Sequence, residues 1–137
     1  MEYSAAATIN ASPDVVWALL TNAADYPNWN PTVVRVEGDI VEGQKIKVVA
    51  TISPGRAFPA KVTELVPRRR MVWQGGMPLG LFKGVRTFTL EPAGEGTQFS
   101  MREVFSGPLL GMFKGSMPNL QPSFDEFARS LKLRAEG

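Results

Sequence analysis

The clearest hydrophobic pattern lies at the C-terminal end of the chain. Four apolar side chains there are spaced at i, i+4, i+7 and i+11: Leu120, Phe124, Phe127 and Leu131. This spacing predicts one face of an amphipathic helix. Pro118 and Pro122 lack a backbone N–H, and their rings oppose the preceding turn. We therefore predict a short helical piece upstream, a break between residues 115 and 122, and a main helix ending near Arg134.

Near the N-terminus, residues 2–10 alternate between two faces and predict a first strand. Ser12 is a good helix N-cap and Pro13 a good first helical residue, so a helix is expected to follow. Residues 22–31 are predicted to form turns, because a residue that precedes a proline, as Tyr26 does, is disfavoured in a helical conformation.

From residue 32 onward the apolar positions recur with a period of two, which indicates strands. Val34 and Val36 are expected to share the buried face of the first of these. The next strand alternates through Ile46, Val48, Ala50 and Ile52. Further strands are predicted in residues 58–62, 71–73, 85–91 and 97–105, with a glycine-rich apolar loop from Gly75 to Gly84.

The order of these elements predicts the fold class. A strand and a helix are followed by consecutive strands joined by hairpins, and then by a long helix, which is typical of α+β proteins with an antiparallel sheet. We predict a helix-grip fold, in which a curved antiparallel sheet of about seven strands wraps around the long C-terminal helix. The length of 137 residues fits a single domain, 1–137.

The composition excludes several kinds of site. There is no Cys and no His, which removes disulfides, thiolate nucleophiles, Ser-His-Asp triads and the usual zinc ligands. We predict no metal, no cofactor and no assigned catalytic residue. The net charge of +2 is small, and no basic, aromatic-rich stretch indicates nucleic-acid binding. No apolar stretch is long enough for a membrane span or a signal peptide, so a cytoplasmic location is expected.

Several motifs resemble one protein family. The segments Ser12–Asn22, Tyr26–Pro31, Gly94–Thr97 and Glu103–Gly107, together with the terminal helix, are similar to START-like helix-grip (SRPBCC) proteins. The branch is that of polyketide cyclases/dehydrases and lipid transport proteins, and the resemblance covers nearly the whole chain. It implies a cavity between the sheet and the long helix that holds a hydrophobic molecule. The motifs belong to the scaffold and identify no catalytic residue.

We accordingly predict a ligand-binding cavity lined by inward-facing side chains of the sheet and helix. Its apolar members are Ile52, Phe58, Val62, Trp73, Phe88, Met101, Met117, Leu120 and Phe124. Ordinary core packing is the alternative for the tryptophans and methionines.

Arg86 and Glu103 are the predicted polar members of this cavity. On the last hairpin, matching the apolar faces pairs Leu90 with Phe99 and Phe88 with Met101, which places Arg86 opposite Glu103. A charge on an apolar face needs a partner, because isolated burial costs several kcal/mol. The pair is either a polar anchor for a ligand or an ion pair at the rim of the cavity.

Three functions remain open. The leading hypothesis is a module that binds a small hydrophobic or amphipathic ligand. The second is an enzyme of the cyclase or dehydratase type, with Glu103 among few candidate acids or bases. The third is a protein-interaction module that uses the apolar loop around Leu79, which also fits a cavity mouth, a transient membrane contact or a dimer contact. The chain is expected to be a monomer or a homodimer, and Arg68 to Arg70 a solvated hairpin end.

Overall fold

A computed structural model describes residues 1–137. Seven strands form one antiparallel sheet in the order β1-β7-β6-β5-β4-β3-β2. The strands are β1 (Glu2–Ile9), β2 (Val33–Glu37), β3 (Lys45–Ala50), β4 (Phe58–Val66), β5 (Arg70–Gly76), β6 (Lys83–Ala93) and β7 (Gly96–Ser106). The helices are α1 (Pro13–Thr21), α2 (Tyr26–Trp29), α3 (Leu110–Phe113) and α4 (Gln121–Glu136), with 3₁₀ turns η1 (Ala23–Asp25) and η2 (Pro78–Gly80). The predicted α+β helix-grip fold is confirmed.

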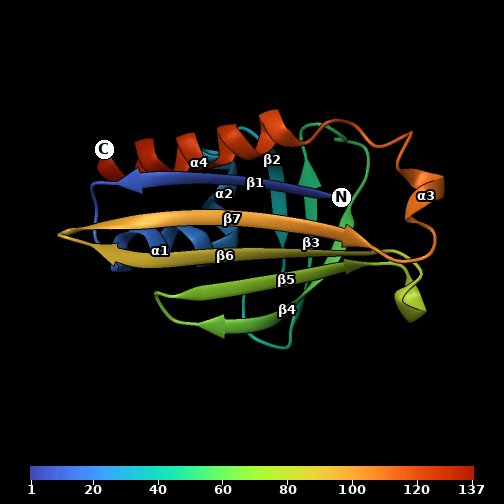
Figure 1. The fold of residues 1–137 in the computed structure, drawn as a ribbon. Coiled ribbons are helices and arrows are strands. Elements are labelled where there is room, and N and C mark those ends of the chain that lie inside the picture. The colour runs from blue at the N-terminus through green and yellow to red at the C-terminus, as the bar shows by residue number, and fades with distance from the viewer.

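Helix α4 lies alongside β1 and covers part of the curved sheet (Figure 1). Its predicted apolar face is confirmed, since Phe124, Phe127 and Leu131 are buried and Leu120 is half-buried. The Phe127 ring lies between the sheet and the α1–α2 region. Its centroid is 5.8 Å from that of Phe88, with Tyr26, Trp29 and Phe99 also within 6.4 Å. Full burial of one such ring stabilises the fold by about 2–3 kcal/mol.

The predicted break in the terminal helix is also confirmed. Helix α3 is a single short piece, residues 114–120 contain no regular helix, and α4 begins at Gln121 with Pro122 in its first turn. Proline is tolerated there because the first N–H groups of a helix have no partner within the helix.

Two details of the predicted strands are wrong. A bulge at Val34 shifts the register between β2 and β3, so Val33 and Val36 are buried while Val34 is exposed. A bulge adds one residue and reverses which face the following side chains occupy. Strand β3 ends at Ala50, and Ile52 lies exposed in the β3–β4 loop.

The expected turn between α1 and β2 is instead helical. Tyr26 precedes Pro27 but has helical angles, φ −50° and ψ −46°. Its ring is fully buried, and its hydroxyl donates a hydrogen bond of 2.6 Å to the Leu20 carbonyl. These tertiary interactions outweigh the local preference against a helical residue before proline.

The buried Tyr26 hydroxyl predicts a dependence of stability on pH. Burial raises its pKa, whereas a tyrosine in an unfolded chain ionises near pH 10. Above that pH the native state keeps the Tyr26 hydroxyl proton, whereas the unfolded chain loses it. Each further pH unit therefore lowers the free energy of unfolding by about 1.4 kcal/mol. In denaturant unfolding between about pH 8 and pH 11, the free energy of unfolding of Tyr26→Phe should fall less steeply with pH than that of the wild type. Parallel slopes for the two proteins would contradict this assignment.

Candidate functional site

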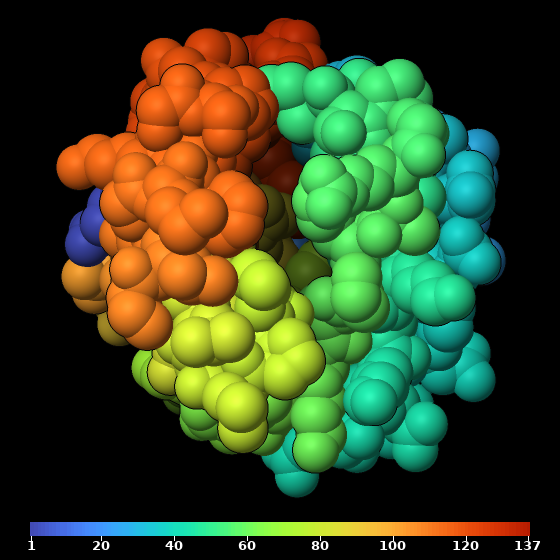
Figure 2. Space-filling model, turned by 90° about the vertical axis from the view of Figure 1, so that its right-hand side faces the viewer, coloured from blue at the N-terminus to red at the C-terminus, as the bar shows by residue number.

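A hollow opens at the end of the sheet where β5 ends and β6 begins (Figure 2). Its rim is formed by the β3–β4 loop (residues 51–57), the β5–β6 loop (residues 77–82) and the segment that carries α3 (residues 107–120). Atoms with the colours of α4 and β6 are visible deeper inside. The concave face of the sheet therefore reaches the surface at this end.

One row of inward-facing residues crosses the sheet below the opening. The strand register places Val62 beside Trp73, Trp73 beside Arg86, Arg86 beside Glu103 and Glu103 beside Tyr3. Most of this row is aromatic or aliphatic, and its two charged members are neighbours. Val62 and Trp73 are buried, whereas Tyr3, Arg86 and Glu103 are half-buried, so only the charged end of the row is partly accessible.

The next row toward the opening has glycines at its centre. Gly75 pairs with Gly84, where sequence analysis had expected both to belong to a loop. A Cβ at Gly75 would lie 2.7 Å from the carbonyl oxygen of Pro59, so close approach of β4 favours glycine there. A Cβ at Gly84 would lie 2.9 Å from Glu103 Oε2. The space in front of Gly84 is occupied by the Glu103 carboxylate and by the Phe105 ring, whose nearest atom would lie 3.1 Å from such a Cβ.

The pairing of Arg86 with Glu103 is confirmed, as are the pairs Phe88–Met101 and Leu90–Phe99. Arg86 Nη2 and Nε lie 2.7 and 2.8 Å from the same carboxylate oxygen, Glu103 Oε1. The guanidinium also covers the Phe124 ring, with Cζ 4.8 Å from the ring centroid. The Arg86 side chain is 23% exposed and that of Glu103 is 14% exposed. No protein hydrogen bond reaches Glu103 Oε2, so the carboxylate keeps one free acceptor.

Three buried side-chain donors near this region have no hydrogen-bond partner: Trp29 Nε1, Asn30 Nδ2 and Trp73 Nε1. The rings of Trp29 and Trp73 both pack against Tyr26, at centroid distances of 5.1 and 6.1 Å. Asn30 uses its oxygen to accept from the Thr32 backbone N–H and hydroxyl. Sequence analysis did not identify Asn30 as a candidate, and an asparagine before a proline carries no signal of burial.

The structure distributes the predicted lining residues over three depths. The buried core contains Val62, Trp73, Phe88, Met101 and Phe124. Met117 and Leu120 are half-buried between α3 and the start of α4, and Ile52 and Phe58 are exposed at the rim. The predicted set therefore runs from the rim to the core along one end of the molecule, with Arg86 and Glu103 between.

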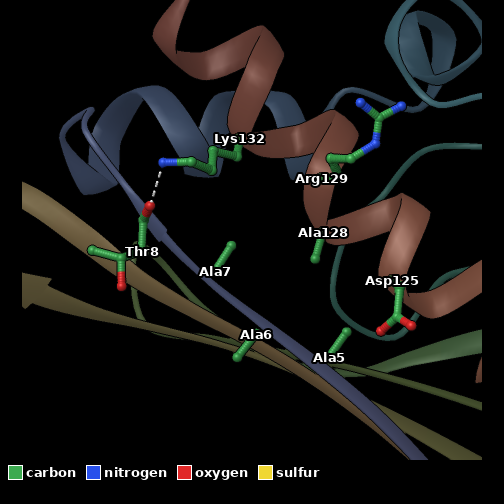
Figure 3. Close-up of a pocket in the computed structure, with 8 residues that line it drawn as sticks. All are labelled: Ala5, Ala6, Ala7, Thr8, Asp125, Ala128, Arg129 and Lys132. Carbon is green, nitrogen blue, oxygen red and sulfur yellow. Dashed lines mark hydrogen bonds between the residues drawn. The ribbon is translucent and has the colours of Figure 1, made fainter.

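A second groove lies between β1 and α4 (Figure 3). It is lined by Ala5, Ala6, Ala7, Thr8, Asp125, Ala128, Arg129 and Lys132. Lys132 Nζ crosses it to donate to the Thr8 carbonyl at 2.7 Å. Nearby, the Asn10 N–H and Lys132 lower the pKa of the Glu136 carboxyl. The small alanines account for the groove, and none of the unpaired buried donors lines it.

The arginine-rich turn at residues 68–70 does not form a binding site, and the structure contains no metal-ligand cluster or membrane-spanning helix. Arg68, Arg69 and Arg70 are exposed, and Arg68 and Arg70 form exposed ion pairs with Asp14 and Glu64. Such exposed pairs contribute little to stability. No group of three or more acidic side chains is placed to hold a metal ion. None of the helices is both long enough and apolar enough to cross a membrane.

The curved antiparallel sheet and the C-terminal helix define a helix-grip fold. The profile of the family described as polyketide cyclase / dehydrase and lipid transport matches residues 1–136, and the chain belongs to this family. A comparison with curated proteins found no match. The family and the fold fit a ligand-binding or a polyketide cyclase-like role.

Solved structures with the same fold come from several contexts. The Aha1 dimer of Colwellia psychrerythraea has a TM-score of 0.74 at 22% identity, over 99% of this chain and 96% of that one. A START superfamily protein of Mycobacterium smegmatis has a TM-score of 0.70 at 17% identity, over 98% and 97% of the chains. The di-domain aromatase/cyclase StfQ of the steffimycin biosynthetic pathway has a TM-score of 0.76 at 18% identity, over 98% of this chain and 50% of that one. At these identities the comparison establishes the fold.

The ion pair predicts a specific pattern of stabilities. Arg86→Met should lower the free energy of unfolding by about 2–4 kcal/mol, because it leaves the Glu103 carboxylate partly desolvated without its cation. The double variant Arg86→Met/Glu103→Leu should recover most of the loss, since neither charge is then stranded. Urea unfolding measures both. As a matched control, Arg102→Met breaks the exposed pair with Glu2 and should have a much smaller effect. Equal losses for Arg86→Met and Arg102→Met would contradict the prediction.

Proposed function

We propose that the protein binds a small hydrophobic or amphipathic ligand in the hollow between the sheet and α4. The ligand's apolar body packs against apolar side chains of the row that contains Trp73 and Tyr3. Its polar group meets the Arg86–Glu103 pair in the same row. The observation that carries the proposal is the hollow at this end of the sheet (Figure 2), together with the half-buried Arg86–Glu103 pair in the row below it.

The hydrogen-bonding state of the residues supports a ligand that carries a polar group. Glu103 Oε2 has no protein donor, and Trp73 Nε1, two strands away in the same row, has no acceptor. A buried donor without a partner costs about 1–3 kcal/mol. A ligand hydroxyl, or a water brought in with the ligand, would supply the donor that Glu103 Oε2 lacks. The polar group therefore contributes orientation, while the apolar body contributes most of the affinity.

A glycine substitution tests this position directly. Gly84→Ala places a methyl group 2.9 Å from Glu103 Oε2 and 3.1 Å from the Phe105 ring. These contacts are with side chains, so the protein should still fold, with a loss of about 1–3 kcal/mol. Saturable binding of environment-sensitive fatty or aromatic probes should weaken about tenfold or more. Probe fluorescence titration measures the binding, and urea unfolding measures the stability.

Gly55→Ala is the matched control for this substitution. Gly55 lies in the β3–β4 loop without positive φ, and a Cβ there meets no atom within 4 Å. Its probe affinity should equal that of the wild type. Absence of saturable binding across a broad hydrophobic library would end the proposal. Equal loss of affinity in both variants would show that the probes report on loop changes and not on the hollow.

A second candidate function is catalysis of the cyclase or dehydratase type. It is favoured by the free oxygen of Glu103, because a carboxylate held by Arg86 with one open acceptor site has the geometry of a general base. In such an enzyme, Glu103→Gln should abolish turnover of a polyketide-like substrate while leaving substrate affinity nearly unchanged. In a binding protein, the same variant should weaken binding of a polar-headed ligand. Measuring affinity and turnover with this one variant separates the two functions.

A further inference from the structure

Large exposed apolar side chains gather around the opening of the hollow. Of the eleven large hydrophobic residues that are exposed, six lie on its rim. We call these six the mouth surface: Ile52, Phe58, Met77, Leu79, Leu81 and Met112. Elsewhere on the molecule such residues are mostly scattered singly, as at Leu133 on α4. Isolated exposed apolar residues are ordinary, whereas a clustered set marks an interaction site.

The segments that bear this surface are held together. The Leu109 N–H donates to the Leu81 carbonyl at 2.9 Å, which joins the β5–β6 loop to the segment with α3. The rings of Phe82 and Phe113 pack edge to face at 5.4 Å beneath them. The β3–β4 loop faces both across the opening (Figure 2). The rim is therefore held in place by backbone hydrogen bonding and by half-buried aromatic rings, which support the exposed apolar side chains.

Leu79 is the most unusual member of the mouth surface. Its backbone is left-handed, with φ 62° and ψ 20°, and it is 96% exposed. A left-handed conformation is unfavourable for leucine, and glycine or asparagine would adopt it more easily. Exposure gives no compensating burial within the chain. Strain at an exposed apolar residue points to a role outside the fold itself.

The charges on the rim have one sign. Residues 50–58, 76–84 and 105–120 contain Arg56, Lys83 and Lys114 and no Asp or Glu. None of these three cations forms a salt bridge with the chain. Acidic residues do occur at the opposite end of β6 and β7, where Glu91 and Glu95 flank the turn. The mouth surface thus combines apolar side chains with unpaired positive charge.

We propose that the mouth surface docks on an anionic phospholipid bilayer. Leu79, Met112 and their apolar neighbours enter the interfacial region, while the three cations meet lipid phosphates and anionic headgroups. The hollow then opens toward the acyl chains. A hydrophobic ligand can enter or leave without crossing water, whose exclusion of apolar surface is the main barrier to such a transfer.

The charge distribution favours a lipid surface over a second copy of the chain. Two mouth surfaces placed face to face would bring together two sets of unpaired cations with no acidic residue between them. Like charges across an interface oppose association. An anionic bilayer offers the complementary charge together with an apolar interior, which matches both properties of the rim.

Vesicle co-sedimentation of the full chain tests this docking without any ligand, so its outcome is independent of the ligand proposal. The probe is phosphatidylcholine vesicles with and without about 30% phosphatidylserine. Binding should be saturable and should require the anionic lipid. Leu79→Asn should weaken it about tenfold, yet leave the thermal midpoint unchanged or raise it, because asparagine tolerates the left-handed conformation. Lys83→Gln/Lys114→Gln should remove the preference for anionic vesicles.

The matched control is Leu133→Asn, the same exchange at a residue on α4 that is 56% exposed and outside the mouth surface. It should leave vesicle binding unchanged. Three results would overturn the proposal: no binding to anionic vesicles, equal loss of binding in Leu79→Asn and Leu133→Asn, or a stable dimer in solution that Leu79→Asn dissociates. The last would assign the mouth surface to contact between copies of the chain.

Discussion

The structure depends on the packing of the Phe127 ring of α4 against the concave face of the sheet. This one ring touches the sheet at Phe88 and Phe99 and the α1–α2 region at Tyr26 and Trp29. It therefore joins parts of the chain that are far apart in sequence. A single helix is narrower than a curved sheet of seven strands, so it cannot cover the whole concave face. Because α4 begins only at Gln121, the uncovered part lies at the end where β5 stops and β6 starts.

The residues on the uncovered end follow from this arrangement. Side chains beneath α4 are apolar and buried, whereas the row that reaches past the first turn of α4 contains Arg86 and Glu103. Partial exposure lowers the desolvation cost of both charges, and their mutual hydrogen bonds offset much of the rest. The Phe124 ring adds a cation–π contact from the first turn of α4. The pair thus lies at a depth where partial exposure lowers the cost of burying its charges and still leaves it partly accessible to solutes.

Much of this arrangement can be predicted from sequence, and the failures have physical causes. The facing of Arg86 and Glu103 was predictable because a one-residue slip would expose a whole set of apolar side chains. The helix break was predictable because proline acts locally. The bulge at Val34 and the helical Tyr26 were not, since each depends on tertiary packing that overrides a local preference. The pairing of Gly75 with Gly84 was also missed, because glycine has no side chain to signal a register.

Those two glycines lie on the concave face of the sheet, between its buried interior and the rim of the hollow. They occupy the row between the ion pair and the rim, and Gly84 is buried against the Glu103 carboxylate and the Phe105 ring. A larger residue at position 84 would displace Glu103 and Phe105, and one at position 75 would collide with the Pro59 carbonyl. Polar rim loops would leave these inner contacts unchanged but would make the entrance of the hollow unfavourable to apolar molecules. In the proposed function, the apolar rim and the Arg86–Glu103 pair act on the same solute in sequence, so the exposed, left-handed Leu79 and the two glycines beside the pair would belong to one functional surface.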